Sequence, residues 1–183
     1  HLVHNGVIEN YEQLKASLSA KGAIFYSETD SEVLANLIAY NLQQQDEPIT
    51  AKTVYRSIRA SLAAVEGTYG LAIMCASVPG TLFGARKGSP LILGVGKDEM
   101  MIASDASAIR ARTREVVYLD DNQIVTLTDD NFSITTIEEA EVVPEISTIS
   151  WKDEEAELVG FEHYMLKEIH DQPGALENAF RGR

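Results

Sequence analysis

The sequence predicts an α+β fold in which helices pack against the faces of antiparallel sheets. Three observations predict it. Helical periodicity dominates the first third of the chain, strand-like runs fill the middle, and helical patterns return near the C-terminal end. The runs in the middle are joined by connections far shorter than the roughly dozen residues that a parallel crossover needs, so we expect antiparallel pairing. A length of 183 residues fits one domain.

The first element is a short apolar run at residues 2–3, which predicts a strand. The Asn5-Gly6 pair that follows predicts a tight turn, because both residues tolerate positive φ. The sequence begins with His1 rather than methionine, within what we interpret as a strand already under way. We therefore expect that the fold is N-terminally truncated in this chain.

Three helices are predicted next. The first spans residues 10–20, with Asn10 as a candidate N-cap. Residues 24–26 carry β-forming side chains and predict a short extended segment. The second helix begins after Thr29, since Thr29 and Glu32 have the spacing of a capping box. The apolar face of the third helix comprises Val54, Ile58, Leu62 and Val65.

Seven strand-like runs follow, separated by turn signals rich in Gly, Pro, Asp and Asn. They are residues 70–76, 82–85, 91–95, 100–103, 116–119, 124–127 and 132–137. A short helix is predicted at residues 106–112, and the acidic stretch 138–157 is predicted to be irregular. Two helices, at residues 164–170 and 174–180, close the chain.

Composition excludes several classes of protein. The formal net charge is −13 and the basic residues are scattered, which argues against a nucleic-acid partner. No apolar run approaches the roughly 20 residues that cross a bilayer, so no membrane segment is predicted. The single cysteine, Cys75, excludes an internal disulfide and favours a reducing, cytoplasmic location. Its apolar neighbours predict a buried structural thiol rather than a nucleophile.

The familiar catalytic and metal-binding motifs do not occur in the sequence. It has no P-loop, no G-x-S-x-G, no dinucleotide fingerprint and no H-E-x-x-H. His163 and His170 are seven residues apart with Glu168 between them, whereas zinc ligands on one helix are usually four apart. We interpret them as half-exposed helix residues and predict neither a metal site nor a cofactor.

Two places are candidates for chemistry. The side-chain amide of Asn5 and the backbone N–H of Gly6 could point at one oxygen, as the donors of an oxyanion hole do. Asp30, at the start of a helix, could bind a cationic group such as an α-ammonium, or could simply favour the positive end of the helix dipole. On local sequence alone, an ordinary turn and a dipole contact are the simpler interpretations.

Together these segments resemble one family, the class II glutamine amidotransferases, which are N-terminal-nucleophile hydrolases. The resemblance rests on residues 3–11 (VHNGVIENY), 27–33 (SETDSEV), 85–91 (ARKGSPL) and 102–105 (IASD). It implies a four-layer αββα sandwich of antiparallel sheets. Residues 163–173 (HYMLKEIHDQP) and 181–183 (RGR) are similar to the glutamine–fructose-6-phosphate aminotransferase (glucosamine-6-phosphate synthase) branch. There, this segment leads from the glutaminase domain into a sugar-isomerase domain.

The resemblance implies roles for particular residues. In that family an N-terminal cysteine attacks the glutamine carboxamide, with its own α-amine as general base. By resemblance, Asn5 and Gly6 supply the oxyanion donors and Asp30 binds the α-ammonium of glutamine. The nucleophile should lie upstream of His1, so we expect residues 1–183 to be a partial glutaminase domain that is inactive alone. The implied partners are glutamine and the sugar-isomerase domain, and about residues 164–183 lead toward that domain. The resemblance also implies that the parent enzyme is a homo-oligomer.

Two alternatives stay open at this point. The chain could be a non-catalytic binding or assembly module that keeps the same fold. It could also be another class II amidotransferase, which residues 163–173 argue against.

Overall fold

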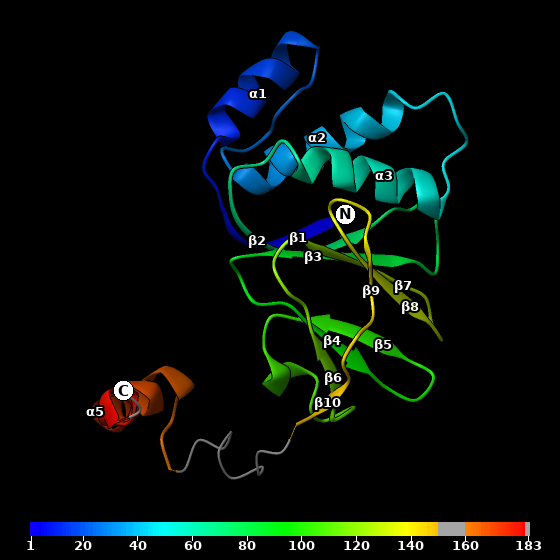
Figure 1. Cartoon of the computed structure of the whole chain (residues 1–183). Coiled ribbons are helices and arrows are strands. Elements are labelled where there is room, and N and C mark those ends of the chain that lie inside the picture. The colour runs from blue at the N-terminus through cyan, green and yellow to red at the C-terminus, as the bar shows by residue number, and fades with distance from the viewer. Residues whose placement is uncertain (150–159, 182–183) are drawn as a thin grey trace. The chain divides into compact units, whose positions relative to one another are not determined.

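The computed structural model describes residues 1–149 and 160–181, and the chain divides into two compact units, His1–Ile149 and Ser150–Arg183. The first unit contains two antiparallel sheets (Figure 1). The larger sheet has the order β1-β2-β3-β7-β8-β9. Its strands are β1 (Leu2–Ile8), β2 (Gly67–Met74), β3 (Leu82–Lys87), β7 (Gln123–Leu127), β8 (Phe132–Thr136) and β9 (Glu141–Val142). The smaller has the order β10-β6-β4-β5, from β4 (Ile92–Val95), β5 (Met100–Ala103), β6 (Glu115–Tyr118) and β10 (Ser147–Thr148).

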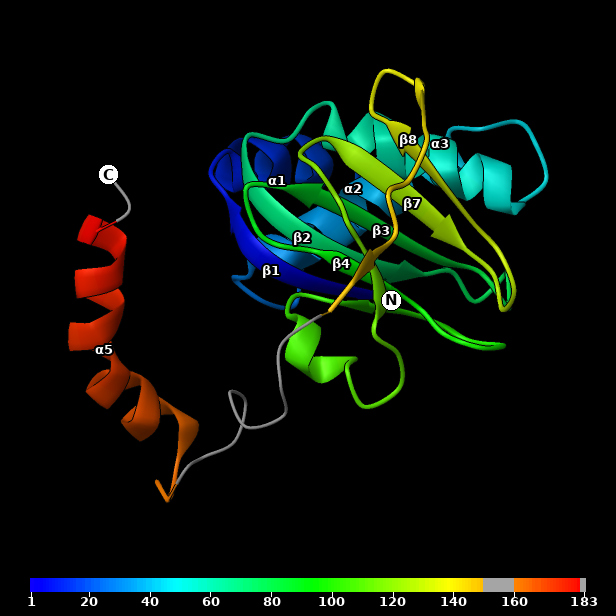
Figure 2. The ribbon, with the colours of Figure 1, turned by 60° about the horizontal axis from the view of Figure 1, so that its bottom comes forward.

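Three helices cover one face of the larger sheet, and the smaller sheet lies against the other face (Figures 1 and 2). The helices are α1 (Tyr11–Ala20), α2 (Asp30–Gln43) and α3 (Ala51–Leu62). Strand alternation builds both cores, since Ile124 packs into the core under the helices and its neighbour Val125 into the core between the sheets. Phe83 and Leu82 divide in the same way. The predicted α+β sandwich of antiparallel sheets is confirmed.

The local signals of the helices are also confirmed in part. The hydroxyl oxygen of Thr29 accepts a hydrogen bond from the Glu32 amide, so Thr29 caps α2. The Glu32 carboxylate does not complete a capping box, because it accepts instead from the amides of Tyr26 and Ser27. Asn10 stands at the start of α1 without a side-chain cap; its amide instead bridges the Ala64 carbonyl and the Glu66 amide.

The turn predicted at Asn5-Gly6 is wrong. β1 runs without interruption from Leu2 to Ile8 and pairs residue for residue with β2 (Figure 1). Gly6 has a φ of +148°, and a Cβ there would stand 2.2 Å from the Thr68 carbonyl oxygen. Glycine is therefore needed at this position for close approach to β2 rather than for a turn.

Three further predictions need correction. Residues 24–26 form no strand: Ile24 and Tyr26 are exposed and no strand pairs with them. The helix predicted at 106–112 is a single 3-10 turn, η1 (Ala106–Ala108), capped by Asp105. The acidic stretch predicted to be irregular contributes β9 and β10 as short edge strands, and its residues 150–157 lie outside the described part.

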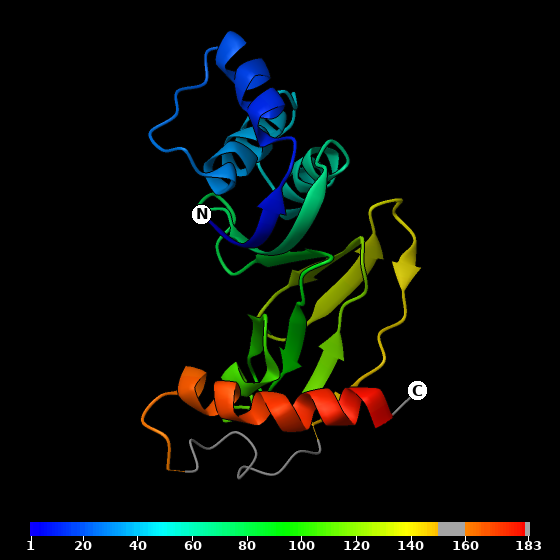
Figure 3. The same cartoon turned by 90° about the vertical axis from the view of Figure 1, so that its left-hand side faces the viewer.

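The second unit contains α5 (Tyr164–Arg181), which Figure 3 shows as one helix. The sequence pattern predicts two helices here, separated at Pro173, and this prediction is wrong. Pro173 instead lies inside α5, although an interior proline removes one backbone hydrogen bond and clashes with the preceding turn. No helix among residues 1–149 and 160–181 has the length and apolar character needed to span a bilayer.

Candidate functional site at the free edge of β1

Within the described residues, β1 is the edge strand of the larger sheet, and its hydrogen-bonding pattern decides which amides are free. His1 and Met74 exchange both backbone hydrogen bonds, and Glu9 donates to Glu66. Because bonded and non-bonded pairs alternate in an antiparallel ladder, the odd-numbered residues of β1 bond to β2. The amides of the even-numbered residues, among them Gly6 and Ile8, point to the open edge.

Asp30 closes part of that edge. It is the first residue of α2, and its Oδ2 accepts a hydrogen bond of 2.9 Å from the Ile8 amide. Oδ1 accepts from the Ser31 hydroxyl at 3.4 Å. The side chain remains 23% exposed, and a carboxylate offers about four lone-pair positions, so acceptor capacity is left on the solvent side.

Gly6 and Asp30 therefore share one edge. The Gly6 amide lies one strand repeat, about 7 Å, from the Ile8 amide to which Asp30 binds. The structure brings these two predicted site residues together although they are far apart in the sequence. The result is a backbone N–H donor directed away from β2 and a carboxylate acceptor that lies on the same open side of β1.

Asn5 lies on the adjoining surface. Side chains alternate along β1, so the exposed Asn5 side chain projects from the face opposite to α2. Its cross-strand partner is Gly70, where an added Cβ would stand 3.0 Å from the Pro90 carbonyl oxygen. The backbone at Pro90 thus passes close to β2 on the Asn5 side, and a side chain at position 70 would crowd it.

Side-chain hydrogen bonds hold the turn at residues 88–90, which borders Asn5. Arg86 donates from Nε to the Ser89 carbonyl at 3.2 Å and from Nη1 to the Leu119 carbonyl, while the Asp121 carboxylate accepts from the Gly88 amide at 2.9 Å. These bonds fix the turn beside Asn5.

On the Asp30 side, the Glu32 carboxylate accepts from the Ser27 hydroxyl at 2.6 Å and from two backbone amides. The Ser27 hydroxyl, together with the Tyr26 and Ser27 amides, holds the pKa of Glu32 below its usual value. The segment that leads into α2 is thereby anchored to the first turn of the helix.

Sequence reasoning missed one member of this cluster, His4. Its side chain is only 1% exposed and its Nδ1 lies 3.1 Å from Ser31 Oγ and 3.7 Å from Asp30 Oδ1. Its place in the segment before Asn5, on the same strand face as Ile8, was the available signal. Strand alternation alone would have put His4 on the α2 side.

The other candidates lie away from this edge. Cys75 follows the end of β2 and is half-buried, whereas the sequence predicts a buried thiol, because it is beyond the last paired residue of the strand. No group of three potential metal ligands occurs within residues 1–149 and 160–181. His170 stacks on the ring of Phe161, with 5.2 Å between ring centroids.

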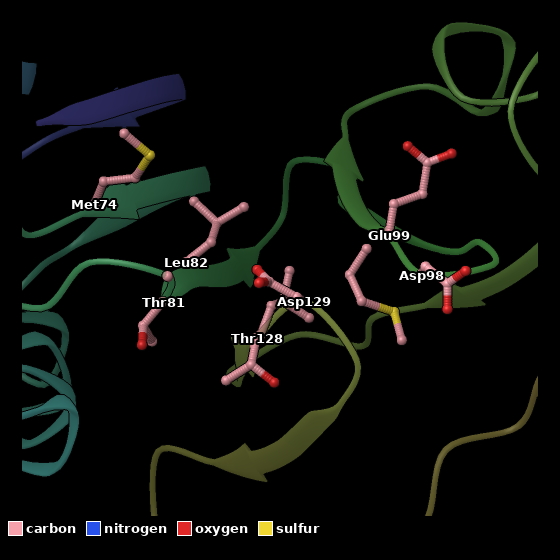
Figure 4. A pocket seen from close by; sticks show the side chains of 10 residues that line it. Met74, Thr81, Leu82, Asp98, Glu99, Thr128 and Asp129 are labelled. Atoms are coloured by element: carbon pink, nitrogen blue, oxygen red, sulfur yellow. The ribbon is translucent and has the colours of Figure 1, made fainter.

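A cavity of about 280 Å³ opens at the far end of the sheets, between the β4–β5 and β7–β8 turns (Figure 4). Its carboxylates include Asp98, Glu99 and Asp129. Glu99 is bound by both ends of the Arg112 guanidinium, which holds its pKa low. The charge of Glu99 is therefore neutralised within the protein.

The layered antiparallel sheets, with an amide donor and a carboxylate on one free edge, form an α+β sandwich of the kind that the resemblance to N-terminal-nucleophile hydrolases implies. Residues 1–111 match the family described as a glutamine amidotransferase domain, and the chain belongs to that family. Two solved structures agree, each with a TM-score of 0.60 over 74% of this chain and 28% of theirs. They are glutamine phosphoribosylpyrophosphate amidotransferase from B. subtilis, at 25% identity, and a structure described as the allosteric regulatory enzyme of purine biosynthesis, at 26%.

Curated relatives are more similar in sequence. The chain is 42% identical over 182 residues to glutamine–fructose-6-phosphate aminotransferase [isomerizing] of Chlorobaculum tepidum and 44% identical over 182 residues to that of Pyrococcus horikoshii. The alignments cover 100% and 99% of this chain but 29% of each relative. The chain thus spans less than a third of the length of these relatives.

Proposed function

We propose that the chain is the greater part of the glutaminase domain of a glucosamine-6-phosphate synthase, which hydrolyses glutamine to glutamate and ammonia for the amination of fructose 6-phosphate. The observation that carries the proposal is the shared edge of β1. The Gly6 amide and the Asp30 carboxylate are about 7 Å apart along the strand, with an intervening residue of β1 between them. That spacing suits an extended glutamine with its carboxamide oxygen at one end and its α-ammonium at the other.

In this arrangement the protein stabilises charge at both ends of glutamine. Attack on the carboxamide carbon moves negative charge onto its oxygen, and we assign the Gly6 amide and the Asn5 side chain as the donors for that charge. The Asp30 carboxylate pairs with the α-ammonium and fixes which amide is presented. The amide nitrogen leaves as ammonia after it is protonated, and the acyl-enzyme is then hydrolysed to glutamate.

The nucleophile is proposed to lie outside residues 1–183. Cys75, the only cysteine in the sequence, is beyond the end of β2 and has no free α-amine to act as its base. We accordingly propose that the 183-residue chain alone releases no glutamate. Glutamate release by the purified chain, verified by its intact mass, would refute this part of the proposal.

The parent enzyme supplies the remaining partners of the proposal. The relatives are named as isomerizing aminotransferases and are more than three times as long as the aligned region, which supports a further domain that binds the sugar phosphate. Identity above 40% to proteins of this one name supports the amino-sugar enzyme over another class II amidotransferase. A homo-oligomeric state and a cytoplasmic location stay predictions.

The test is kinetic and uses the longer protein in which this chain is preceded by its natural upstream segment. Asn5→Ala is expected to lower the kcat of glutamine hydrolysis by about 100- to 1,000-fold with little change in KM, the usual effect of removing an oxyanion donor. Asp30→Asn is expected to raise KM. Synthesis from free ammonia should be spared in both variants, since neither residue touches the sugar. An unchanged glutaminase rate in Asn5→Ala would contradict the assignment.

A further inference from the structure

The side chain of His4, on β1, is buried where it meets α2 and β2. Its Nδ1 faces Ser31 Oγ of α2 at 3.1 Å, and its Nε2 lies 3.5 Å from the Thr68 carbonyl oxygen of β2. The ring is 1% exposed, so it cannot contact a ligand directly. Any effect of His4 on the site must pass through its neighbours.

The neighbour that connects His4 to the site is Ser31. The Ser31 hydroxyl has one proton, and Asp30 Oδ1 lies 3.4 Å away as its acceptor. An imidazole protonated at Nδ1 donates to Ser31 Oγ and leaves the Ser31 proton free for Asp30. Nδ1 is itself 3.7 Å from the same carboxylate oxygen, so the three side chains form one short polar chain.

This polar chain fixes the orientation of the Asp30 carboxylate. The Ile8 amide holds Oδ2 at 2.9 Å, and the Ser31 hydroxyl, backed by His4, approaches Oδ1. With one contact on each oxygen, the carboxylate plane is set and its remaining lone pairs face the open edge. With Nδ1 protonated, His4 is the donor to Ser31 Oγ; removing His4 then lets the Ser31 hydroxyl turn away and leaves Asp30 with the bond from the Ile8 amide.

We infer that His4 is a positioning residue for recognition of the substrate α-ammonium, acting through Ser31 on Asp30. The inference deepens the proposed function and rests on it. It predicts that His4 favours glutamine over a primary amide that lacks the α-ammonium, because such an amide gains nothing from an oriented Asp30. Glutaramate, which is glutamine without its α-amino group, is the matched substrate.

The experiment compares kcat/KM for L-glutamine and for glutaramate in the longer protein that contains the upstream segment. His4→Ala is expected to lower the glutamine-to-glutaramate ratio about ten-fold, the effect of losing roughly one hydrogen bond, mainly through KM for glutamine. Glutaramate kinetics should change little. Ser31→Ala should reproduce the effect, and the double variant should add little to either single one.

Conservative variants separate positioning from packing. In His4→Asn the amide nitrogen stands near the place of Nδ1 and can donate to Ser31, so most of the ratio should return. His4→Gln places its amide nearer to Nε2 and should not restore it. Leu2→Ala truncates a partly buried side chain on the same face of β1, two residues from His4, and should leave the ratio unchanged.

The outcomes are distinguishable. If Asp30→Asn collapses the ratio and His4→Ala leaves it intact, the His4 inference is wrong and the proposed function stands. If Leu2→Ala lowers the ratio as much as His4→Ala, the effect is general loosening of β1, which also overturns the inference. If Asp30→Asn itself leaves the ratio intact, or the protein releases no glutamate, the proposed orientation of glutamine fails and the inference falls with it.

Discussion

Replacing Gly6 by alanine tests the geometry of the β1 edge most directly. A Cβ at Gly6 would stand 2.2 Å from the Thr68 carbonyl oxygen, 2.7 Å from its carbonyl carbon and 2.9 Å from the Tyr69 Cα. All three are backbone atoms of the paired strand, so no side chain can swing aside. Relief requires β1 and β2 to separate at the centre of their seven-residue register.

The expected cost is large relative to the stability of a small domain. Forcing extra volume into a packed site costs about 1–3 kcal/mol. A non-glycine residue in an unfavourable backbone region adds about 1–3 kcal/mol. We therefore expect Gly6→Ala to lower the free energy of unfolding by about 2–6 kcal/mol, out of a total of about 5–15 kcal/mol.

Urea unfolding followed by circular dichroism measures this change. With an m-value of about 2 kcal/mol/M, the midpoint should fall by about 1–3 M. Gly22→Ala is the matched control, since Gly22 also has a positive φ, +93°, but nothing lies within 4 Å of an added Cβ. It should cost only about 1 kcal/mol of backbone strain. Equal midpoints for the two variants would refute the clash as the reason for glycine at position 6.

Three further predictions concern polar groups of the same unit. Tyr55→Phe should lower stability by about 1 kcal/mol in urea unfolding, because it removes a 2.7 Å hydrogen bond to the Thr135 hydroxyl. Tyr69→Phe should be neutral or stabilising in the same assay, because the buried Tyr69 hydroxyl has no hydrogen-bond partner among the described residues. Equal losses of unfolding free energy in Tyr55→Phe and Tyr69→Phe would contradict both predictions. Burial, with a smaller effect of the Asp121 charge, raises the pKa of Tyr69 to about 12. In a pH titration of tyrosinate absorbance, the wild-type protein should therefore show a group that ionises near pH 12, and Tyr69→Phe should lack it. The pKa of Glu32 in the folded protein lies below its unfolded value near 4.5, so the contribution of Glu32 to folding stability is present above that pH and is lost on acidification. Glu32→Gln should therefore lose less stability than wild type between about pH 5 and pH 3. Identical profiles of stability against pH would contradict this.

Much of the architecture could be predicted because its causes are local. Apolar residues spaced three and four apart identified the three helices that cover the larger sheet, and Thr29 marked the start of α2. Short connections predicted antiparallel pairing, which every pair of strands confirms. The predictions that failed concerned segments whose local preference is overridden by contacts elsewhere in the chain, such as residues 24–26, where the amide of Tyr26 donates to the Glu32 carboxylate instead of to a neighbouring strand.

The candidate site could likewise be predicted only in part from the sequence. The chemistry of Asn5, Gly6 and Asp30 was apparent from residue type and from a family resemblance, and residue type does not depend on folding. Their mutual placement was not apparent, because Asp30 meets the Ile8 amide 22 residues away and His4 meets Ser31 27 residues away.

Gly6 shows why local sequence could not decide the rest. In isolation, Asn-Gly favours a turn, since both residues enter positive φ at little cost. Here the backbone of Thr68, more than sixty residues later in the chain, supplies a flat paired surface that only glycine can approach, and seven register pairs outweigh the local preference. Residue types determined which chemistry was possible, whereas the pairing of β1 with β2 and its contact with α2 determined where that chemistry is directed, because hydrogen bonds between distant segments exist only after the chain has folded.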